Sequence, residues 1–460
     1  MGRYERLTVL DELFLHLEGP DSHMHVGGTA IFEGPPPDYE GFLDNVRRRL
    51  QMVPRFRQKL MTVPLGVGRP VWVDDTHFNI EYHVRHTALP APGDRTKLNR
   101  LTARIMSQQL DRDKPLWEIW FAEGLADDRF ALISKTHHCL VDGVSGADIM
   151  SVLLDLTPEP QEIEFKHWMP EPEPTADQLL LDALRERLTS PAEALRTMQS
   201  MLMDPAKAPN RLIEALKALG EFVGGSLDFA PPSSLNQAIG PHRRFETIIA
   251  GLEDFKRVKN HFGGTVNDVV LAACTGGLRR LLIGRGERVE GLDIRAMVPV
   301  SVRTDERRGS LGNQVASMWA PLPVWETDPI RRLEVITERM DGLKSSGQAV
   351  GAQVLTSLGE WAPPTIVAQA SRLVARQRAF NLVITNVPGP QFPLYTMGRE
   401  MEEVYPVVPL AENTTVGIAL LSYNGQIGFG IHGDYDTAPD VAVLAEGIEK
   451  SVAELVSLVP

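Results

Sequence analysis

The segment at residues 130–143, FALISKTHHCLVDG, has the clearest pattern of hydrophobic and polar positions in the chain. Its first half alternates as a β-strand does, and two adjacent histidines, His137 and His138, stand where the pattern breaks. Ser145 and Asp148 follow with the spacing of a helix capping box, just before another apolar run. The segment therefore predicts a strand, a sharp turn and a helix, with the histidines at the turn. A rigid strand end fixes a histidine ring while the turn leaves it accessible, which suits a general base.

Strand-like and helix-like patterns alternate through both halves of the chain. Strand patterns predict β-strands at 26–32, 70–73, 117–121, 244–250, 294–302, 313–322, 381–390, 416–422 and 427–431. Amphipathic patterns predict helices at 39–50, 95–110, 252–261, 263–282, 331–343 and 439–457. The order of elements indicates two mixed α/β halves.

A different composition separates the two halves. Residues 157–175 are rich in Pro and Glu, which predicts an extended surface linker. Residues 176–228 have an almost wholly helical pattern with a Met-rich stretch. Two interpretations of this helical block stay open: helices that face a core and pack over a domain, or an interdomain insert with a lipid-facing surface.

Length and composition restrict the class of protein. At 460 residues the chain is too long for one ordinary core, so we expect two domains. Its 43% apolar and 23% charged residues are typical of a globular protein. The net charge of −13 argues against a sequence-nonspecific nucleic-acid binder, and two cysteines favour a reducing compartment over a disulfide framework. The N-terminus lacks a signal-peptide pattern, and no apolar run approaches the roughly 20 residues that span a bilayer, so we expect a soluble chain.

The two histidines are expected to have different tasks. Adjacent strand residues point to opposite faces, so a metal site that uses both rings would be strained, and we expect no metal there. One of the two rings, His137 or His138, can face a cavity and act as a base. The other ring then faces inward and is held by hydrogen bonds. Asp142 could orient the catalytic ring directly, or it could fasten the loop through an arginine.

A covalent nucleophile has little support in the sequence. No GxSxG motif occurs, and neither a Walker A loop nor a GxGxxG motif is present. Cys139 is next to the histidines, and we interpret it as a small packed residue. Direct transfer without a covalent enzyme intermediate is the mechanism that remains.

Two further short motifs have more than one local interpretation. The PLW triplet, Pro115, Leu116 and Trp117, could line a hydrophobic channel or could begin a strand with a packed tryptophan. Asn267 and Asp268 lie where a helix is expected to begin, and Thr265 with Asp268 has capping-box spacing. Local sequence alone favours capping for this pair.

Taken together, these motifs resemble the bacterial wax ester synthase/acyl-CoA:diacylglycerol acyltransferase family. The HHxxxDG signature of that family matches HHCLVDG at 137–143, and PLW at 115–117, ND at 267–268 and NVPGP at 386–390 also match, in the family's order. HHxxxDG alone is shared with peptide-synthetase condensation domains and other coenzyme A-dependent acyltransferases. The resemblance extends over essentially the full chain, interrupted only by the helical insert. Longer matching stretches are DELFLHLE at 11–18, MHVGG at 24–28, PRFRQKL at 54–60, GRPVWVDD at 68–75, GPHRRF at 240–245 and MVPVSVR at 297–303.

The resemblance implies two chloramphenicol-acetyltransferase-like α/β domains with a channel between them. Part of the C-terminal half is then expected to cross over and complete the N-terminal sheet. We place an N-terminal acyltransferase domain at 1–165, a helical linker at 166–235 and a C-terminal acyltransferase-like domain at 236–460.

By the motif match, His138 is the base, while His137 and Asp142 support the geometry of the site. Gly143 would let backbone approach the reacting carbonyl. PLW would line the channel, and Asn267 and Asp268 would reach toward the site from the second domain in addition to capping their helix.

The implied reaction is transfer of a long-chain acyl group from acyl-CoA, a substrate and not a cofactor, to diacylglycerol or a fatty alcohol. We expect no cofactor, no metal and no nucleic-acid partner. Because both substrates are hydrophobic, we expect the protein to be cytoplasmic and to bind peripherally to the inner membrane or to lipid inclusions. Two alternatives stay open: condensation-type transfer to another acceptor, and a lipid-binding homologue without catalysis.

Overall fold

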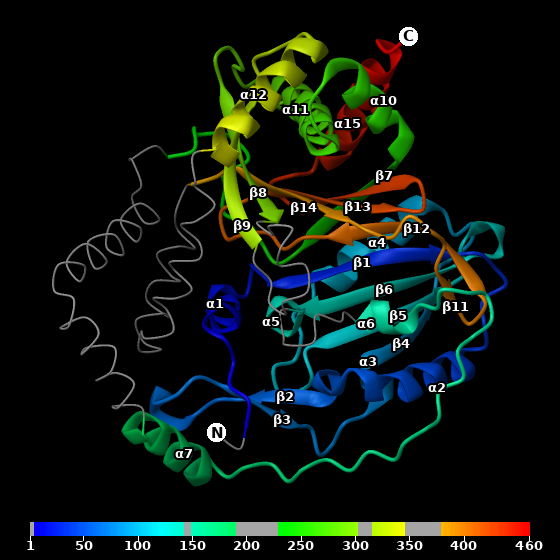
Figure 1. The fold of residues 1–460 in the computed structure, drawn as a ribbon, viewed down its shortest axis with the longest axis vertical. Helices are drawn as coiled ribbons and strands as arrows, with labels where there is room; N and C mark the ends of the chain where they lie inside the picture. The colour runs from blue at the N-terminus through cyan, green and yellow to red at the C-terminus, as the bar shows by residue number, and fades with distance from the viewer. Residues whose placement is uncertain (1–3, 142–148, 190–228, 302–314, 346–378) are drawn as a thin grey trace.

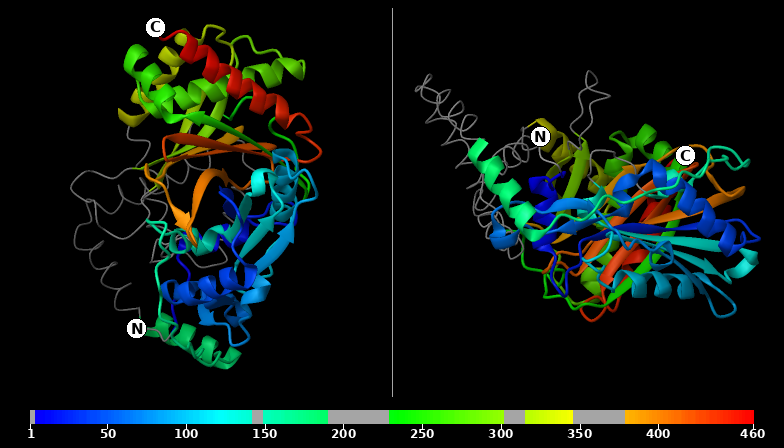
Figure 2. Two further views of the ribbon diagram at one scale, coloured as in Figure 1. Left: turned by 90° about the vertical axis from the view of Figure 1, so that its right-hand side faces the viewer. Right: turned by 90° about the horizontal axis from the view of Figure 1, so that it is seen from below.

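A computed structural model describes residues 4–141, 149–189, 229–301, 315–345 and 379–460. Two six-stranded mixed sheets lie one above the other (Figures 1 and 2). The mixed α/β fold with two sheet domains, expected from the sequence, is confirmed. Within the described residues, no helix combines the length and apolar character needed to cross a bilayer.

The first sheet carries the histidine motif. Its strands, in spatial order, are β11 (Tyr395–Thr396), β12 (Arg399–Val407), β1 (His25–Phe32), β6 (Phe130–His137), β5 (Trp117–Glu123) and β4 (Val84–Ala88). Its associated helices are α1 (Val9–Leu17), α2 (Tyr39–Arg49), α3 (Ile80–His83), α4 (Arg95–Met106), α5 (His138–Val141) and α6 (Ile149–Leu153). A small hairpin-like sheet of β2 (Gln58–Met61) and β3 (Val71–Asp74) lies beside it, next to α7 (Ala176–Thr189) (Figure 1).

The second sheet belongs to the C-terminal half. Its strands, in spatial order, are β7 (Arg243–Gly251), β14 (Gln426–Asp434), β13 (Val416–Tyr423), β10 (Leu382–Pro388), β8 (Asp293–Ser301) and β9 (Val315–Pro323). One face is covered by α10 (Leu252–Phe262), α11 (Val266–Gly284), α12 (Pro329–Ser345) and α15 (Val441–Ser457) (Figure 1). A single large apolar cluster fills the space between this face and these helices.

Helix α11 is central to that cluster. Thr265 accepts a hydrogen bond from the Asp268 backbone, and Asp268 accepts from the Thr265 backbone, so the predicted capping box is present. At Gly277 an added Cβ would lie 2.9 Å from the backbone nitrogen of Ile448, because α15 crosses at that point. Glycine is therefore required where the two helices touch.

The two halves exchange strands. β12, which follows β10 in the chain, pairs antiparallel with β1, and Gly28 lies opposite Pro406. The chain then returns to the second sheet as β13 and β14. This is the expected crossover, whereas the domain boundaries at 165/166 and 235/236 stay predictions.

All strands and helices predicted from the sequence occur where the chain is described, with shifted ends. The extended linker at 157–175 has no helix or strand, as predicted. Of the helical block at 176–228, only α7 lies within the described residues. Local patterns failed to predict α1, α3, α5, β2, β4, β11 and β12.

Candidate active site

His137 ends β6 and is fully enclosed, with 0% of its surface exposed. Its backbone N–H donates to the carbonyl of Leu116 (2.9 Å), and β1 places His25 directly opposite it. The backbone N–H of Cys139 donates to His137 Nδ1 (3.1 Å), so the ring proton must be on Nε2. Both ring nitrogens of His137 are buried: Nδ1 accepts the Cys139 N–H, and Nε2 has no hydrogen-bond partner among the described residues.

The group that faces His137 Nε2 is a buried carboxylate, Glu18, which follows α1. Glu18 Oε2 lies 3.7 Å from His137 Nε2 and accepts from Arg112 Nε (3.0 Å) and Nη2 (2.6 Å). Glu18 Oε1 lies 3.5 Å from His25 Nε2. Burial by itself raises the pKa of the Glu18 carboxyl, but His137, His25 and Arg112 outweigh burial and hold the pKa well below its usual value. Glu18 is therefore an ionised acceptor that orients the His137 ring.

His138 has different surroundings. It begins the short helix α5, and its backbone N–H donates to the carbonyl of Met24 (2.8 Å). Its ring stacks on Phe14 of α1, with 3.8 Å between ring centroids and 23° between planes, and the residue is partly exposed. The expected separation of the two rings is present. The expected cause was incomplete, since the strand ends at His137 and the change to helix turns His138 away.

The rest of the HHxxxDG motif is only partly described. Asp142 and Gly143 lie outside the described residues, as does the proposed cap of α6 at Ser145 and Asp148. Cys139 is 1% exposed and packs in the apolar core of the first sheet, as predicted. Burial raises the pKa of its thiol well above the usual value, which disfavours the nucleophilic thiolate.

The PLW triplet is buried directly beside the histidine strand. Leu116 supplies the carbonyl that holds the His137 backbone, and Pro115 precedes it as another buried residue. Trp117 begins β5, donates from Nε1 to the Phe56 carbonyl (2.7 Å) and stacks on His83 at 4.7 Å between centroids. Of the two local interpretations, the structure places Trp117 as a packed strand-start residue.

Asn267 and Asp268 open helix α11 in the other half. Asp268 is 1% exposed; its Oδ2 is used by the capping box, and its Oδ1 has no hydrogen-bond partner among the described residues. Asn386 of the NVPGP motif donates from Nδ2 to Asn267 Oδ1 (3.4 Å). The structure thus brings ND and NVPGP together, and PLW and His137 together. The described contacts of His137 come from the N-terminal half and include neither Asn267 nor Asp268.

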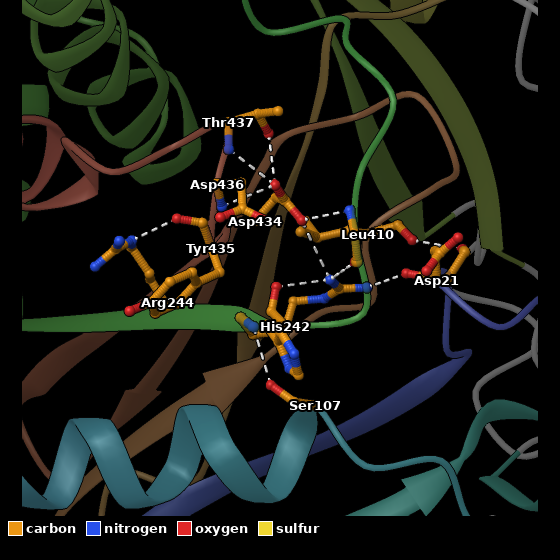
Figure 3. A network of polar contacts seen from close by, with 12 residues as sticks. Asp21, Ser107, His242, Arg244, Leu410, Asp434, Tyr435, Asp436 and Thr437 are labelled. Atoms are coloured by element: carbon orange, nitrogen blue, oxygen red, sulfur yellow. Dashed lines mark hydrogen bonds and ion pairs between the residues drawn. The ribbon is translucent and has the colours of Figure 1, made fainter.

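A buried arginine fastens the segment before β1 to the C-terminal half (Figure 3). Arg243 donates from its guanidinium to the carbonyls of Asp21, Gly240 and His242 and pairs with Asp434 (3.5 Å). Its backbone N–H donates to Ser107 at the end of α4 (2.9 Å). Residues 21–25 lead to Met24 and His25, so this network positions the strand that supports both histidines.

Asp434 completes that network as an ionised acceptor. It accepts from the backbone of Gly240 (2.8 Å) and from the backbone and hydroxyl of Thr437 (2.9 and 2.8 Å). Burial raises the pKa of the Asp434 carboxyl, but these hydrogen bonds and Arg243 outweigh it and lower the pKa. Glu18, His25, Arg112, Arg243 and Asp434 were not identified from local sequence patterns as site residues.

Comparison with known proteins gives consistent matches over the full length. Residues 7–270 match the wax ester synthase/diacylglycerol acyltransferase catalytic domain, and residues 311–456 match the WS/DGAT C-terminal domain. The chain is 37% identical over 458 residues to tgs1 of Mycobacterium tuberculosis, a probable diacylglycerol O-acyltransferase, covering 98% of this chain and 96% of tgs1. It is 35% identical over 456 residues to tgs2 of the same species, also a probable diacylglycerol O-acyltransferase, covering 97% of each chain.

Solved structures match the whole fold. The wax ester synthase/diacylglycerol acyltransferase from Marinobacter aquaeolei is 30% identical with a TM-score of 0.71, covering 99% of this chain and all of that one. A condensation domain of the CDA synthetase has 16% identity and a TM-score of 0.58, covering 99% and 96% of the two chains, so it shares the fold. With two family domains matched in order and homology along its length, this chain is an acyltransferase that belongs to the wax ester synthase/diacylglycerol acyltransferase family.

Proposed function

We propose that the enzyme transfers a long-chain fatty acyl group from acyl-CoA to the hydroxyl of diacylglycerol, and also to fatty alcohols, with His138 as the general base. The observation that carries this proposal is the different burial of the two histidine rings. The His137 ring is fully buried, with Nδ1 bonded to the Cys139 backbone and Nε2 at 3.7 Å from Glu18. His138 is partly exposed and is held in orientation by Phe14 and by its backbone. His138 is therefore the ring of the pair that can meet a substrate.

In the proposed reaction, a His138 ring nitrogen accepts the proton of the acceptor hydroxyl while its oxygen attacks the thioester carbonyl. The C–S bond of the resulting tetrahedral intermediate breaks, and coenzyme A leaves as a thiolate that takes up a proton. A thiol with a pKa of roughly 8.5 leaves readily, so acid assistance is of minor importance. General-base assistance of this kind contributes about 10²–10⁴-fold to the rate.

No covalent acyl-enzyme is part of the proposal. The thiol nearest the histidines, Cys139, is buried and its pKa is raised, so it is a poor nucleophile. We propose that the reaction needs no bound cofactor. Asp142 would hold the loop after the histidines, and Gly143 would let backbone approach the thioester carbonyl. PLW would support the histidine strand, and Asn267 and Asp268 would complete the site from the second half.

The test compares purified wild-type protein with His138→Ala, offered radiolabelled palmitoyl-CoA with diolein or hexadecanol. We expect acyl transfer to fall by at least about 10²-fold with the fold intact, because the proton acceptor is lost. His261→Ala, an exposed histidine on α10, is the matched control and should keep wild-type activity. A near-wild-type rate in His138→Ala would contradict the assignment, and the ratio of the two products gives the acceptor preference.

We further propose that the enzyme binds peripherally to the cytoplasmic surface of the inner membrane or of lipid inclusions through α7. One side of this helix packs on β3, where Leu179 joins a small apolar cluster with Val71 and Val73. The same helix leaves Leu181 52% and Leu184 41% exposed, and the nearby η3 turn (Pro64–Gly66) leaves Leu65 88% exposed. Exposed leucines on a helix at one end of the molecule suit insertion at a lipid surface.

A further inference from the structure

Three potential metal ligands from two distant segments meet beside the small sheet. Asp75 and His77 lie in the turn after β3, and Glu173 lies in the extended segment that leads to α7. One ligand atom from each residue lies within 4.8 Å of the other two. Imidazole and carboxylate together are a ligand set used by zinc and related transition metals, whereas calcium and magnesium prefer oxygen ligands throughout.

Asp75 forms the inner wall of this group. Its side chain is 1% exposed, and its Oδ1 accepts the backbone N–H of His77 (3.0 Å). Its Oδ2 is buried and has no hydrogen-bond partner among the described residues. A buried carboxylate oxygen without a donor is unfavourable, so this atom indicates a missing cation or donor independently of the clustering.

Thr76 links the other two ligands. Its hydroxyl donates to Glu173 Oε1 (3.0 Å) and lies 3.1 Å from His77 Nδ1. Such an outer hydrogen bond holds ligand side chains in the orientation that a metal requires. Lys59 Nζ also lies 2.7 Å from Glu173 Oε1. The carboxylates of Asp75 and Glu173 together with the Lys59 ammonium therefore carry one net negative charge.

We propose that Asp75, His77 and Glu173 form a zinc-binding site that fastens the 157–175 segment to the N-terminal half. Zinc–ligand distances of about 2.0–2.2 Å place tetrahedral ligands about 3.3–3.6 Å apart, so the three side chains need to close by about 1 Å. Water would take the fourth position, since His77 is exposed. The site is structural: its ligands belong neither to the histidine motif nor to the contacts that orient it. The Glu171 backbone N–H donates to Oδ2 of the Asp74 side chain (3.1 Å) and already holds the two segments together, and the ion would strengthen that attachment.

The direct test measures zinc bound to the full-length, untagged protein after dialysis against a chelator and titration with Zn²⁺ alone. We expect one ion per chain at this site, and affinity lower by about 100-fold or more in Asp75→Asn and in His77→Ala, each of which removes a ligand. His261→Ala removes an equally exposed histidine elsewhere and should bind as wild type does. Zinc binding unchanged in both ligand variants, or no binding in wild type, would overturn the proposal.

The second readout is the attachment of the linker, which is independent of acyl transfer. Lys166 is exposed within the linker, so trypsin cleavage there reports its release from the domain. We expect zinc to slow that cleavage and to raise the melting temperature in wild type and His261→Ala but not in His77→Ala. If Asp75 serves only the fold, Asp75→Asn lowers the melting temperature equally with and without zinc, and His77→Ala still responds to zinc. That outcome contradicts the proposal.

Discussion

Glu18 controls the geometry of the histidine pair from a position far earlier in the chain. Its carboxylate lies 3.7 Å from His137 Nε2, and His137 Nδ1 in turn accepts the backbone N–H of Cys139. This chain of contacts fixes the backbone at the point where β6 ends and α5 begins, which is where His138 emerges. We infer that Glu18 is a positioning residue that acts through His137.

Replacing Glu18 by Gln should lower stability at neutral pH, and the deficit should become smaller as the pH falls below 4.5. The carboxyl has a folded-state pKa below its usual value of 4.5, so its stabilising effect is present above pH 4.5 and is lost as the pH falls toward the folded pKa. We expect the variant to be about 1–3 kcal/mol less stable at pH 7, because buried partners lose a charged acceptor. Urea unfolding of both proteins from pH 7 down to pH 3.5 measures the difference.

Glu123→Gln is the matched control for that measurement. Glu123 also faces a histidine, His86, at 3.0 Å, but both side chains are partly exposed. Exposed pairs contribute about 0–1 kcal/mol, so this control should stay close to wild type at every pH. A Glu18→Gln variant whose stability deficit is the same at pH 3.5 and pH 7 would show that the charge is not what stabilises the site.

Residue patterns predicted the division between the histidines but not the group that causes it. Period-two alternation placed His137 on a strand end, and that information is local. Glu18, His25 and Arg112 come from three separate segments, and their meeting depends on how β1 pairs with β6. The stretches that contain Glu18 and His25 stand out only through the family resemblance. A charged residue at the end of the apolar pattern of α1 was the available signal.

At the scale of elements, the crossing of α11 and α15 determines how closely the helical layer packs on the second sheet. The Cα of Gly277 lies 2.9 Å from the Cβ position that a side chain at Gly447 would occupy. Two glycines facing each other allow the helix backbones to approach closely, and the surrounding positions are apolar and buried.

Gly277→Ala should destabilise the protein although alanine favours helices. The new methyl group would lie 2.5 Å from Ile448 Cγ1, and the resulting overpacking costs about 1–3 kcal/mol or more. Gly284→Ala is the control, because it lies in the same helix with nothing within 4 Å of the added methyl. Its effect should be neutral or favourable by up to about 1 kcal/mol. Thermal unfolding of the two variants measures the difference. Equal melting temperatures would contradict this account of the helix crossing.

The elements that local patterns missed are those whose pattern depends on distant partners. β12 reads REMEEVYPV, with three glutamates in nine residues, and its burial follows from its place between β1 and β11. β4 is short and has charged or polar residues at its centre. In contrast, α11 and α15 were predictable because their apolar faces are long and their ends carry clear signals.

At the scale of the whole molecule, the strand crossover and the Arg243 network connect the two sheet domains to each other. β12 joins the first sheet, while Arg243 connects Asp21 to the second sheet through Asp434. Because β1 is bound to β12 on one side and to β6 on the other, C-terminal residues support the strand next to the histidines.

The surface most suited to a lipid interface lies at one end of the molecule. α7 and the η3 turn lie at the end opposite the C-terminus, as both upright views show (Figures 1 and 2). Leu65, Leu181 and Leu184 are exposed there, while Leu179 and Ala183 on the same helix are buried against the domain. Helix α7 therefore combines the two interpretations of the helical block: one face packs on a core and another presents leucines outward.

The paired substitution Leu181→Ser and Leu184→Ser should weaken binding to lipid without unfolding the protein. A fully buried leucine contributes about 1.5–3 kcal/mol, so partial insertion of two leucines supports a loss of about 10- to 100-fold in vesicle binding. Flotation with phosphatidylcholine vesicles, with and without anionic lipid, measures it. Val443→Ser with Leu458→Ser removes two comparably exposed apolar side chains in the C-terminal helical region, at the other end of the molecule, and should float as wild type does. Unchanged flotation of the α7 variant, or an equal loss in the control, would exclude α7 as the docking helix.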